Sequence, residues 1–230
     1  MPYNPETVTT YEGGLKSDLF GRTVRLNVSA FYGKFSNMQL IVGQCDALSP
    51  APGSPCQQTT NAGDSKLWGI EAELSAHPME GLQLDASNSY LHFKYSSVNP
   101  ATGIPLNNAL PFLIKTKVSA GVQYEFPIAA GKLTPRIDVS CQSSFGALGG
   151  TPVDRYTLAN ARLSYRPDNS SWELAAAVQN LFDRFYYTNK FDGNTTGISK
   201  NNPASFSYYN LAQGYVGKPR TFDVSVKYSF

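Results

Sequence analysis

The last nine residues of the chain, Phe222 to Phe230, alternate between apolar and polar side chains without exception. Side chains along a strand point to opposite faces in turn, so this segment predicts a strand with one apolar and one polar face. In a soluble sheet, such a strand at a chain end would fray unless another element covered it. A transmembrane β-barrel needs this pattern, because one face of each strand meets lipid and the other faces a wet lumen.

Composition agrees with a barrel and excludes several other classes of protein. Charged residues make up 16% of the chain, which is low against roughly 25% in soluble domains. The sequence has no apolar run approaching the length of about 18 residues that a transmembrane helix needs. The net charge of +2 does not indicate a nucleic-acid partner. No signal-peptide pattern opens the chain, so we expect that one has been removed or that the chain is an internal piece.

Alternation of this kind recurs along the whole chain. Nine segments show it: 7–17, 22–35, 66–76, 82–95, 113–126, 133–145, 156–166, 172–187 and 220–230. The faces opposite the apolar ones carry charged residues such as Arg25, Glu71, Asp85, Arg136 and Asp138. Charges at this density fit a wet interior, because an unpaired charge in a dry core is very costly.

Short and long connections alternate between these segments. The short ones are 18–22, 77–81, 127–132 and 166–171, and the long ones are 36–65, 96–112, 146–155 and 188–219. Short periplasmic turns opposite long extracellular loops are typical of outer-membrane barrels. This orientation also predicts two aromatic girdles. The lower girdle comprises Tyr124, Phe126, Tyr165, Trp172, Tyr228 and Phe230, and the upper one Tyr11, Tyr32, Trp68, Tyr90 and Phe145.

Four stretches resemble motifs of the TonB-dependent outer-membrane receptors, in the order of that family. Residues 4–17, N-P-E-T-V-T-T-Y-E-G-G-L-K-S, resemble the strand P-E-x-x-x-x-Y-E-x-G-x-K. Residues 68–74, W-G-I-E-A-E-L, resemble the strand x-G-x-E-x-E. Residues 180–187, which begin N-L-F-D and end on two tyrosines, are similar to N-L-F-D-x-x-Y. Residues 217–222, G-K-P-R-T-F, resemble the start of the closing strand, G-x-P-R-x-F.

The resemblance implies an all-β fold, an antiparallel transmembrane β-barrel of 22 strands, of which this chain would supply about the last nine. Residues 1–230 would then be the C-terminal portion of the barrel domain. The plug domain, the TonB box and the first dozen or so strands would lie in an absent N-terminal region.

The family's commonest role implies the function and partners that we expect. The whole protein would bind and import a scarce nutrient, a ferric siderophore, across the bacterial outer membrane, with energy transmitted by TonB. Its partners would be outer-membrane lipid, the siderophore, TonB and the barrel-assembly machinery. No cofactor, metal site or catalytic residue is predicted.

Three sets of residues are candidates for specific roles. The long connection 188–219 carries the aromatic residues Phe191, Phe206, Tyr208, Tyr209 and Tyr215, which could stack on an organic chelate or simply pack on each other. Cys45 and Cys56 flank a loop-like segment and could form a disulfide or remain free thiols. Phe230 resembles the terminal aromatic residue that outer-membrane barrels present to their assembly machinery.

Two details of the sequence leave alternatives open. The N-L-F-D motif at 180–183 interrupts the alternation of its segment, which indicates a bulge or the point where the strand leaves the membrane. An outer-membrane barrel enzyme such as a lipid esterase or phospholipase is a rival hypothesis, which requires a serine beside a histidine on the outer rim; His92 lies near the wall there, but the sequence marks no partner serine. A soluble β-sandwich that binds carbohydrate is a second rival hypothesis.

Overall fold

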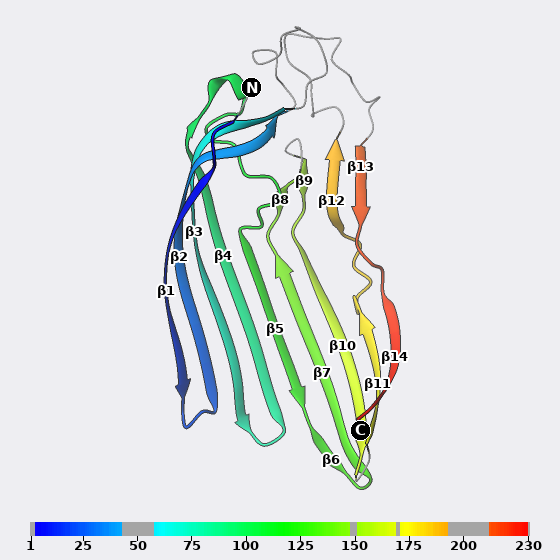
Figure 1. Cartoon of the computed structure of the whole chain (residues 1–230). Coiled ribbons are helices and arrows are strands. Elements are labelled where there is room, and N and C mark those ends of the chain that lie inside the picture. The colour runs from blue at the N-terminus through cyan, green and yellow to red at the C-terminus, as the bar shows by residue number, and fades with distance from the viewer. Residues whose placement is uncertain (1–2, 43–57, 148–150, 169–170, 193–211, 230) are drawn as a thin grey trace.

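The structure is a computed structural model, which describes all residues of the chain except 1–2, 43–57, 148–150, 169–170, 193–211 and 230. Nine strands form one continuous sheet in the order β1-β2-β3-β4-β5-β7-β10-β11-β14 (Figure 1). Their bounds are β1 Thr7–Leu19, β2 Val24–Val42, β3 Gln58–Met79, β4 Leu82–Val98, β5 Thr116–Tyr124, β7 Gly131–Gln142, β10 Tyr156–Pro167, β11 Trp172–Gln179 and β14 Thr221–Tyr228.

Shorter elements extend this sheet at its two ends. Strand β6 (Phe126–Ile128) pairs with β7 at the lower end, and β8 (Phe145–Gly146) pairs with β9 (Pro152–Val153) above it. Strands β12 (Tyr187–Asp192) and β13 (Ala212–Val216) form a separate outer hairpin, and η1 (Pro100–Thr102) is a single 3-10 turn. In the described part of the chain, no helix has the length and apolar character to cross a membrane.

Every pair of neighbours in the main sheet is antiparallel, so the predicted all-β meander is confirmed. Among the described residues, β1 pairs with β2 alone and β14 with β11 alone, so the sheet is open at both edges. The short connections lie at one end of the sheet and the long ones at the other (Figure 1). This arrangement matches the predicted separation of turns and loops.

Cross-strand register sorts the side chains into two faces. Leu15, Val28 and Ala72 lie directly opposite one another on β1, β2 and β3, and therefore share a face. Along β14 that face presents Phe222, Val224 and Val226 with exposed fractions of 73%, 76% and 70%. Rows of exposed apolar side chains across a sheet indicate a surface that contacts something other than water. This is the lipid face, and the opposite one is the lumenal face.

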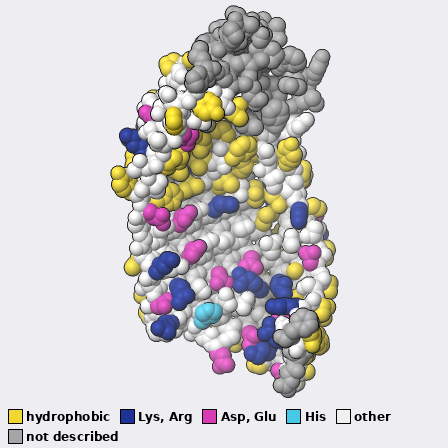
Figure 2. Space-filling model, in the orientation of Figure 1, with side chains coloured by type: hydrophobic (Ala, Val, Ile, Leu, Met, Phe, Trp, Pro, Cys, Tyr) yellow, Lys and Arg dark blue, Asp and Glu magenta, His cyan; other side chains and the backbone are white. Residues whose placement is uncertain are grey.

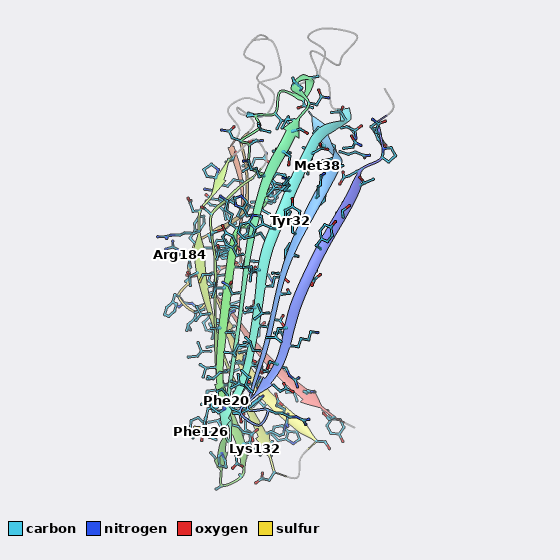
Figure 3. The ribbon with its side chains drawn as sticks, turned by 90° about the vertical axis from the view of Figure 1, so that its left-hand side faces the viewer. Phe20, Tyr32, Met38, Phe126, Lys132 and Arg184 are labelled. Carbon is cyan, nitrogen blue, oxygen red and sulfur yellow. The ribbon has the colours of Figure 1, made fainter. Side chains whose placement is uncertain are left out.

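The upper ends of β2 and β3 differ from the prediction. The sequence predicts a loop over residues 36–65, but β2 continues to Val42 and β3 begins at Gln58. The paired register shifts between Phe35 and Met38, where Asn37 adopts a left-handed φ of 55°. This irregularity hides the period-two pattern while the backbone ladder continues, so the hairpin extends beyond the level of the girdle (Figure 3).

Two further predictions are corrected by the structure. Phe145, which was assigned to the upper girdle, is only 9% exposed because it packs with Ala147 and Val153 in a small core. Ile114 and Tyr187 close over the same core. The predicted strand 172–187 is also too long, since β11 ends at Gln179 and a turn follows.

Because positions 27 and 28 lie on opposite faces, replacing each by arginine should change the stability of the barrel by different amounts. Val28 lies on the lipid face between Tyr32 and the turn at Phe20 (Figure 3), so Val28→Arg should destabilise the full-length barrel by roughly 2–4 kcal/mol. Asn27 lies on the lumenal face, where its amide is 3.4 Å from a carboxylate oxygen of Glu73. Asn27→Arg should therefore change stability by less than about 1 kcal/mol. Free energies of unfolding in liposomes measure both, and equal costs would contradict this assignment of faces.

Candidate functional site: the lumenal face and the outer hairpin

The lumenal face is divided into two zones along the strands. Charged side chains gather over the lower half of the face in view, and hydrophobic ones over its upper half (Figure 2). We call these the charged zone and the aromatic zone. The division follows from the residues at the lumenal positions of β2, β3 and β4, which are polar near the turns and aromatic or aliphatic near the upper end.

Arg136 on β7 is the centre of the charged zone. Its Nε and Nη2 donate to the carboxylate of Asp138, with the shortest contact at 2.6 Å. Its Nη1 donates to Asp85 Oδ2 at 3.0 Å and to Gln123 Oε1 at 3.2 Å. Gln83 donates to the same Asp85 carboxylate at 3.2 Å. The guanidinium thus joins three strands, and charge-assisted bonds of this kind are stronger than neutral ones.

Gly121 on β5 makes this arrangement possible. A Cβ atom at this position would stand 2.5 Å from both Arg136 Nη2 and Asp138 Oδ1, so the charged ends of these two side chains would have to move apart. The guanidinium therefore crosses β5 over the bare backbone of a glycine to reach Asp85 on β4. A larger residue at position 121 would separate the charges on the two sides of β5.

Four smaller ion pairs complete the charged zone toward the turns. Glu173 accepts hydrogen bonds from Arg162 at 3.1 Å and from Arg166 at 2.6 Å, and thereby joins β10 to β11. The other two pairs are Lys132–Glu125 at 2.6 Å and Arg25–Asp18 at 2.8 Å. Pairs this exposed contribute little stability each. Together they give the lower lumenal wall a dense polar surface.

A groove of about 340 Å³ opens onto the charged zone beside Arg136. Charged and amide groups line it, among them Arg25, Asn27, Glu73 and Asp85. Among the described residues, no three His, Cys, Asp or Glu side chains are grouped in a way that could hold a metal ion. Leu74, Ala86, Ala120 and Val139 also line it, so the groove offers hydrogen-bonding groups beside apolar ones.

The aromatic zone was not predicted. Phe31 and Phe35 on β2 and Phe93 and Tyr95 on β4 share the strand parity of the lumenal charges. Tyr95 is 1% exposed and meets Phe93 edge to face at a centroid distance of 4.9 Å. The phenyl ring of Phe31 lies over Gly69, where a Cβ would be 2.7 Å from its Cζ. The sequence does carry a signal for this zone, because from residue 31 of β2 onward apolar residues occupy positions on both faces of the strand.

The predicted ligand residues are only partly described. Tyr215 lies on β13 opposite Asn189, and its side chain is 60% exposed. Phe191 pairs with Gln213 through the backbone of the outer hairpin. Phe206, Tyr208 and Tyr209 lie outside the described residues. The described part of the hairpin also holds Lys190, whose Nζ sits 4.7 Å from the centre of the Tyr187 ring.

Most of the other residues with predicted roles also lie outside the part of the chain that the structure describes. Cys45, Cys56 and Phe230 are not among the described residues, so their roles stay predictions. Cys141 is an exposed free cysteine on β7. His92, the residue invoked for an enzyme, stacks on Trp68 with ring centroids 5.3 Å apart. Because the two rings lie on the lipid face, this histidine belongs to the upper girdle.

The N-L-F-D motif forms a joint between the sheet and the outer hairpin. Asn180 is 4% exposed and has a left-handed φ of 50°. Its amide donates to the carbonyls of Arg184 at 2.9 Å and Lys218 at 3.1 Å, while its carbonyl oxygen accepts from Arg184 N at 2.8 Å. Asn160 on β10 binds its backbone N–H. The interruption predicted at this motif is thus a tight turn that leaves the strand.

The same joint unites two of the motifs found in the sequence. Asp183 accepts a hydrogen bond from Arg220 N at 2.9 Å, which links the N-L-F-D turn to the G-K-P-R stretch. Gly217 donates its N–H to the carbonyl of Tyr186 at 2.9 Å. A side chain at Gly217 would collide with the ring of Tyr186. The two motifs are separated by more than thirty residues in the sequence but form one structural unit.

Comparison with known families now identifies this architecture. Residues 2–181 match the family model described as "TonB dependent receptor-like, beta-barrel". The chain belongs to the TonB-dependent receptor family. Members of this family are outer-membrane proteins of Gram-negative bacteria and are receptors rather than enzymes. The esterase and β-sandwich hypotheses therefore find no support.

Individual relatives agree with this assignment. The ferric-pyoverdine M114 receptor PbuA of Pseudomonas sp. is 28% identical over 228 residues, which cover 96% of this chain and 24% of that receptor. The metal-pseudopaline receptor CntO of Pseudomonas aeruginosa PAO1 is 27% identical over 203 residues, covering 83% of this chain and 25% of the relative. The chain thus spans about a quarter of the length of these curated relatives.

A solved structure shows the same fold. The ferric yersiniabactin uptake receptor FyuA from Yersinia pestis superposes with a TM-score of 0.73 at 21% identity, covering 100% of this chain and 31% of that one. The nine strands therefore have the arrangement of strands in a TonB-dependent receptor barrel.

Removal of the side-chain amide of Asn180 should lower the free energy of unfolding substantially. Asn180→Ala should destabilise the full-length protein by about 2–3 kcal/mol, because the carbonyl oxygens of Arg184 and Lys218 lose their donor and alanine tolerates the left-handed φ less well. Asn107→Ala is the matched control, since Asn107 is an exposed loop residue that forms no side-chain hydrogen bond in the described part of the chain. Chemical denaturation in detergent measures both. A similar cost at the two positions would show that the joint is not specifically stabilising.

Proposed function

We propose that residues 1–230 are the C-terminal part of the barrel of an outer-membrane receptor that binds and imports a scarce nutrient, a ferric siderophore, with energy from TonB. The observation that carries this proposal is the continuous sheet of nine antiparallel strands with a polar lumenal face, in a chain of this family. Two relatives named for ferric pyoverdine and metal-pseudopaline support a metal chelate as the substrate.

The arrangement of the lumenal face supports an organic chelate as the ligand. Half-buried aromatic rings at the upper end, such as Phe31 and Phe93, offer stacking surfaces close to the loops. The exposed Tyr215 on the outer hairpin adds an aromatic surface with a hydroxyl group above them. We propose that Phe191, Phe206, Tyr208, Tyr209 and Tyr215 contribute to ligand capture from this hairpin.

We propose the remaining partners by analogy with the roles typical of this family. TonB would act through a region that precedes this chain in the full-length protein. Outer-membrane lipid would cover the apolar rows of the lipid face. The barrel-assembly machinery would recognise the terminal strand, which ends in Phe230.

Uptake of iron tests the proposed function. Cells that lack the receptor should regain transport of ⁵⁵Fe-labelled ferric pyoverdine when the full-length gene is returned, and lose it when TonB is deleted. Tyr215→Ala should weaken uptake about fivefold through lost stacking, whereas Tyr215→Phe keeps the ring and should stay near wild type. Uptake that does not depend on TonB, or no uptake of ferric pyoverdine or of a ferric catecholate, would contradict the proposal.

Assembly tests the role of the terminal residue. Deletion of Phe230 from the full-length protein should reduce the amount of folded receptor in the outer membrane, because the strand loses its aromatic end and an interfacial anchor. Heat-modifiable mobility on gels and surface labelling measure the folded fraction. Phe230→Tyr keeps the aromatic ring and should assemble normally. Wild-type assembly after the deletion would remove this role from Phe230.

A further inference from the structure

Three lysines stand in a row on the outer surface of the sheet. Lys34 on β2 is directly opposite Lys66 on β3, and Lys66 is directly opposite Lys94 on β4. All three side chains are exposed. They share the strand parity of Tyr32, Trp68 and His92, so they lie on the lipid face. We call these three residues the lysine row. With strands about 4.8 Å apart, it spans roughly 10 Å across the sheet.

The lysine row is electrostatically unfavourable by itself. Like charges directly opposite each other on neighbouring strands destabilise a sheet. In the described part of the chain, none of the three ammonium groups lies within 4 Å of a carboxylate. Asp64, two residues above Lys66, is held by the N–H of Asn37 at 3.0 Å and the hydroxyl of Ser97 at 3.1 Å. An anion from outside the protein would relieve this repulsion.

The position of the lysine row relative to the membrane indicates what that anion is. Tyr11, Tyr32, Trp68 and His92 lie side by side across β1 to β4 and form the upper girdle. Trp68 also meets Tyr90 at a centroid distance of 5.4 Å. Tyr and Trp belts mark the boundary between hydrocarbon and headgroups. The lysines lie two residues further out on each strand, about 6.5 Å along it, which is the level of lipid headgroups.

The leaflet follows from the orientation of the strands. The lysine row lies at the end of the sheet that carries the long connections, with Lys34 between Tyr32 and Met38 on β2 (Figure 3). Long connections face the outside of the cell in outer-membrane barrels. The headgroups beside Lys34, Lys66 and Lys94 are therefore those of the outer leaflet.

We propose that the lysine row binds the phosphate groups of a phosphorylated glycolipid headgroup in the outer leaflet. Clusters of lysines at a membrane surface attract anionic lipids. The row is a flat array of three cations open to the membrane and placed directly above an aromatic girdle, so it can contact a headgroup whose acyl chains lie along the lipid face. This inference depends on the membrane location of the chain and not on the nutrient that the whole protein transports.

Binding of lipid A to the purified full-length receptor tests the proposal. In native mass spectrometry, diphosphoryl lipid A should bind the triple variant Lys34→Gln, Lys66→Gln, Lys94→Gln at least tenfold more weakly than the wild type. The charge-matched control replaces Lys16, Lys117 and Lys227 by Gln, because these lysines are exposed at lumenal positions. That control should bind as the wild type does. The triple replacement of the row by Arg keeps the charge and should also bind normally.

The same experiment separates the possible occupants of the lysine row. A dephosphorylated lipid A should bind wild type and triple variant equally, because the phosphates are the groups recognised. Heat-modifiable mobility checks that each variant is folded. Equal binding of diphosphoryl lipid A to the triple variant and the lumenal control would overturn the proposal and leave the lysines simply solvated. Displacement of the lipid by millimolar inorganic phosphate would also overturn it, because the site would then select the free ion.

Discussion

In the hydrocarbon of a membrane, every backbone N–H and C=O group must find a partner within the protein. The ladder that runs from β1 to β14 meets this requirement for all strands between its two edges. Once this ladder exists, successive side chains must point to opposite faces. The separation of an apolar lipid face from a polar lumenal face therefore follows from backbone pairing, and all other features of the chain are arranged around it.

Backbone pairing also explains which parts of the fold could be predicted. The nine wall strands were predicted because lipid imposes a local alternation on them. Above the girdle that constraint ends, so the upper parts of β2 and β3 carry no clear period although they remain paired. The end of β11 depends on contacts of Asn180 with residues far away in the sequence, which no local pattern can indicate. Phe145 has the parity of a lipid-facing residue but turns into a small core that is closed by Ile114 and Tyr187, which are distant in the sequence.

The candidate site was predicted less completely than the fold, for a related reason. Strand parity correctly placed Arg136 and Asp138 on the lumenal face, but the link to Asp85 requires the gap at Gly121. The aromatic zone was missed because apolar residues were assigned to lipid. Phe31 and Phe93 show that a lumenal wall can change from charged to aromatic along its length. The aromatic residues of the outer hairpin could be named from composition, but their spatial arrangement depends on more than the sequence pattern.

The joint formed by Asn180, Asp183, Tyr186 and Gly217 separates two parts of the chain that face different demands. Its hydrogen bonds run mainly to backbone groups, which are present whatever side chains the neighbouring segments carry. The wall strands below it must present apolar side chains to the hydrocarbon of the membrane, whereas the hairpin above it is exposed to the outside of the cell. Residues in the hairpin can therefore diverge in evolution without altering the register of β11 and β14. A receptor built in this way can acquire a new specificity while its wall stays the same.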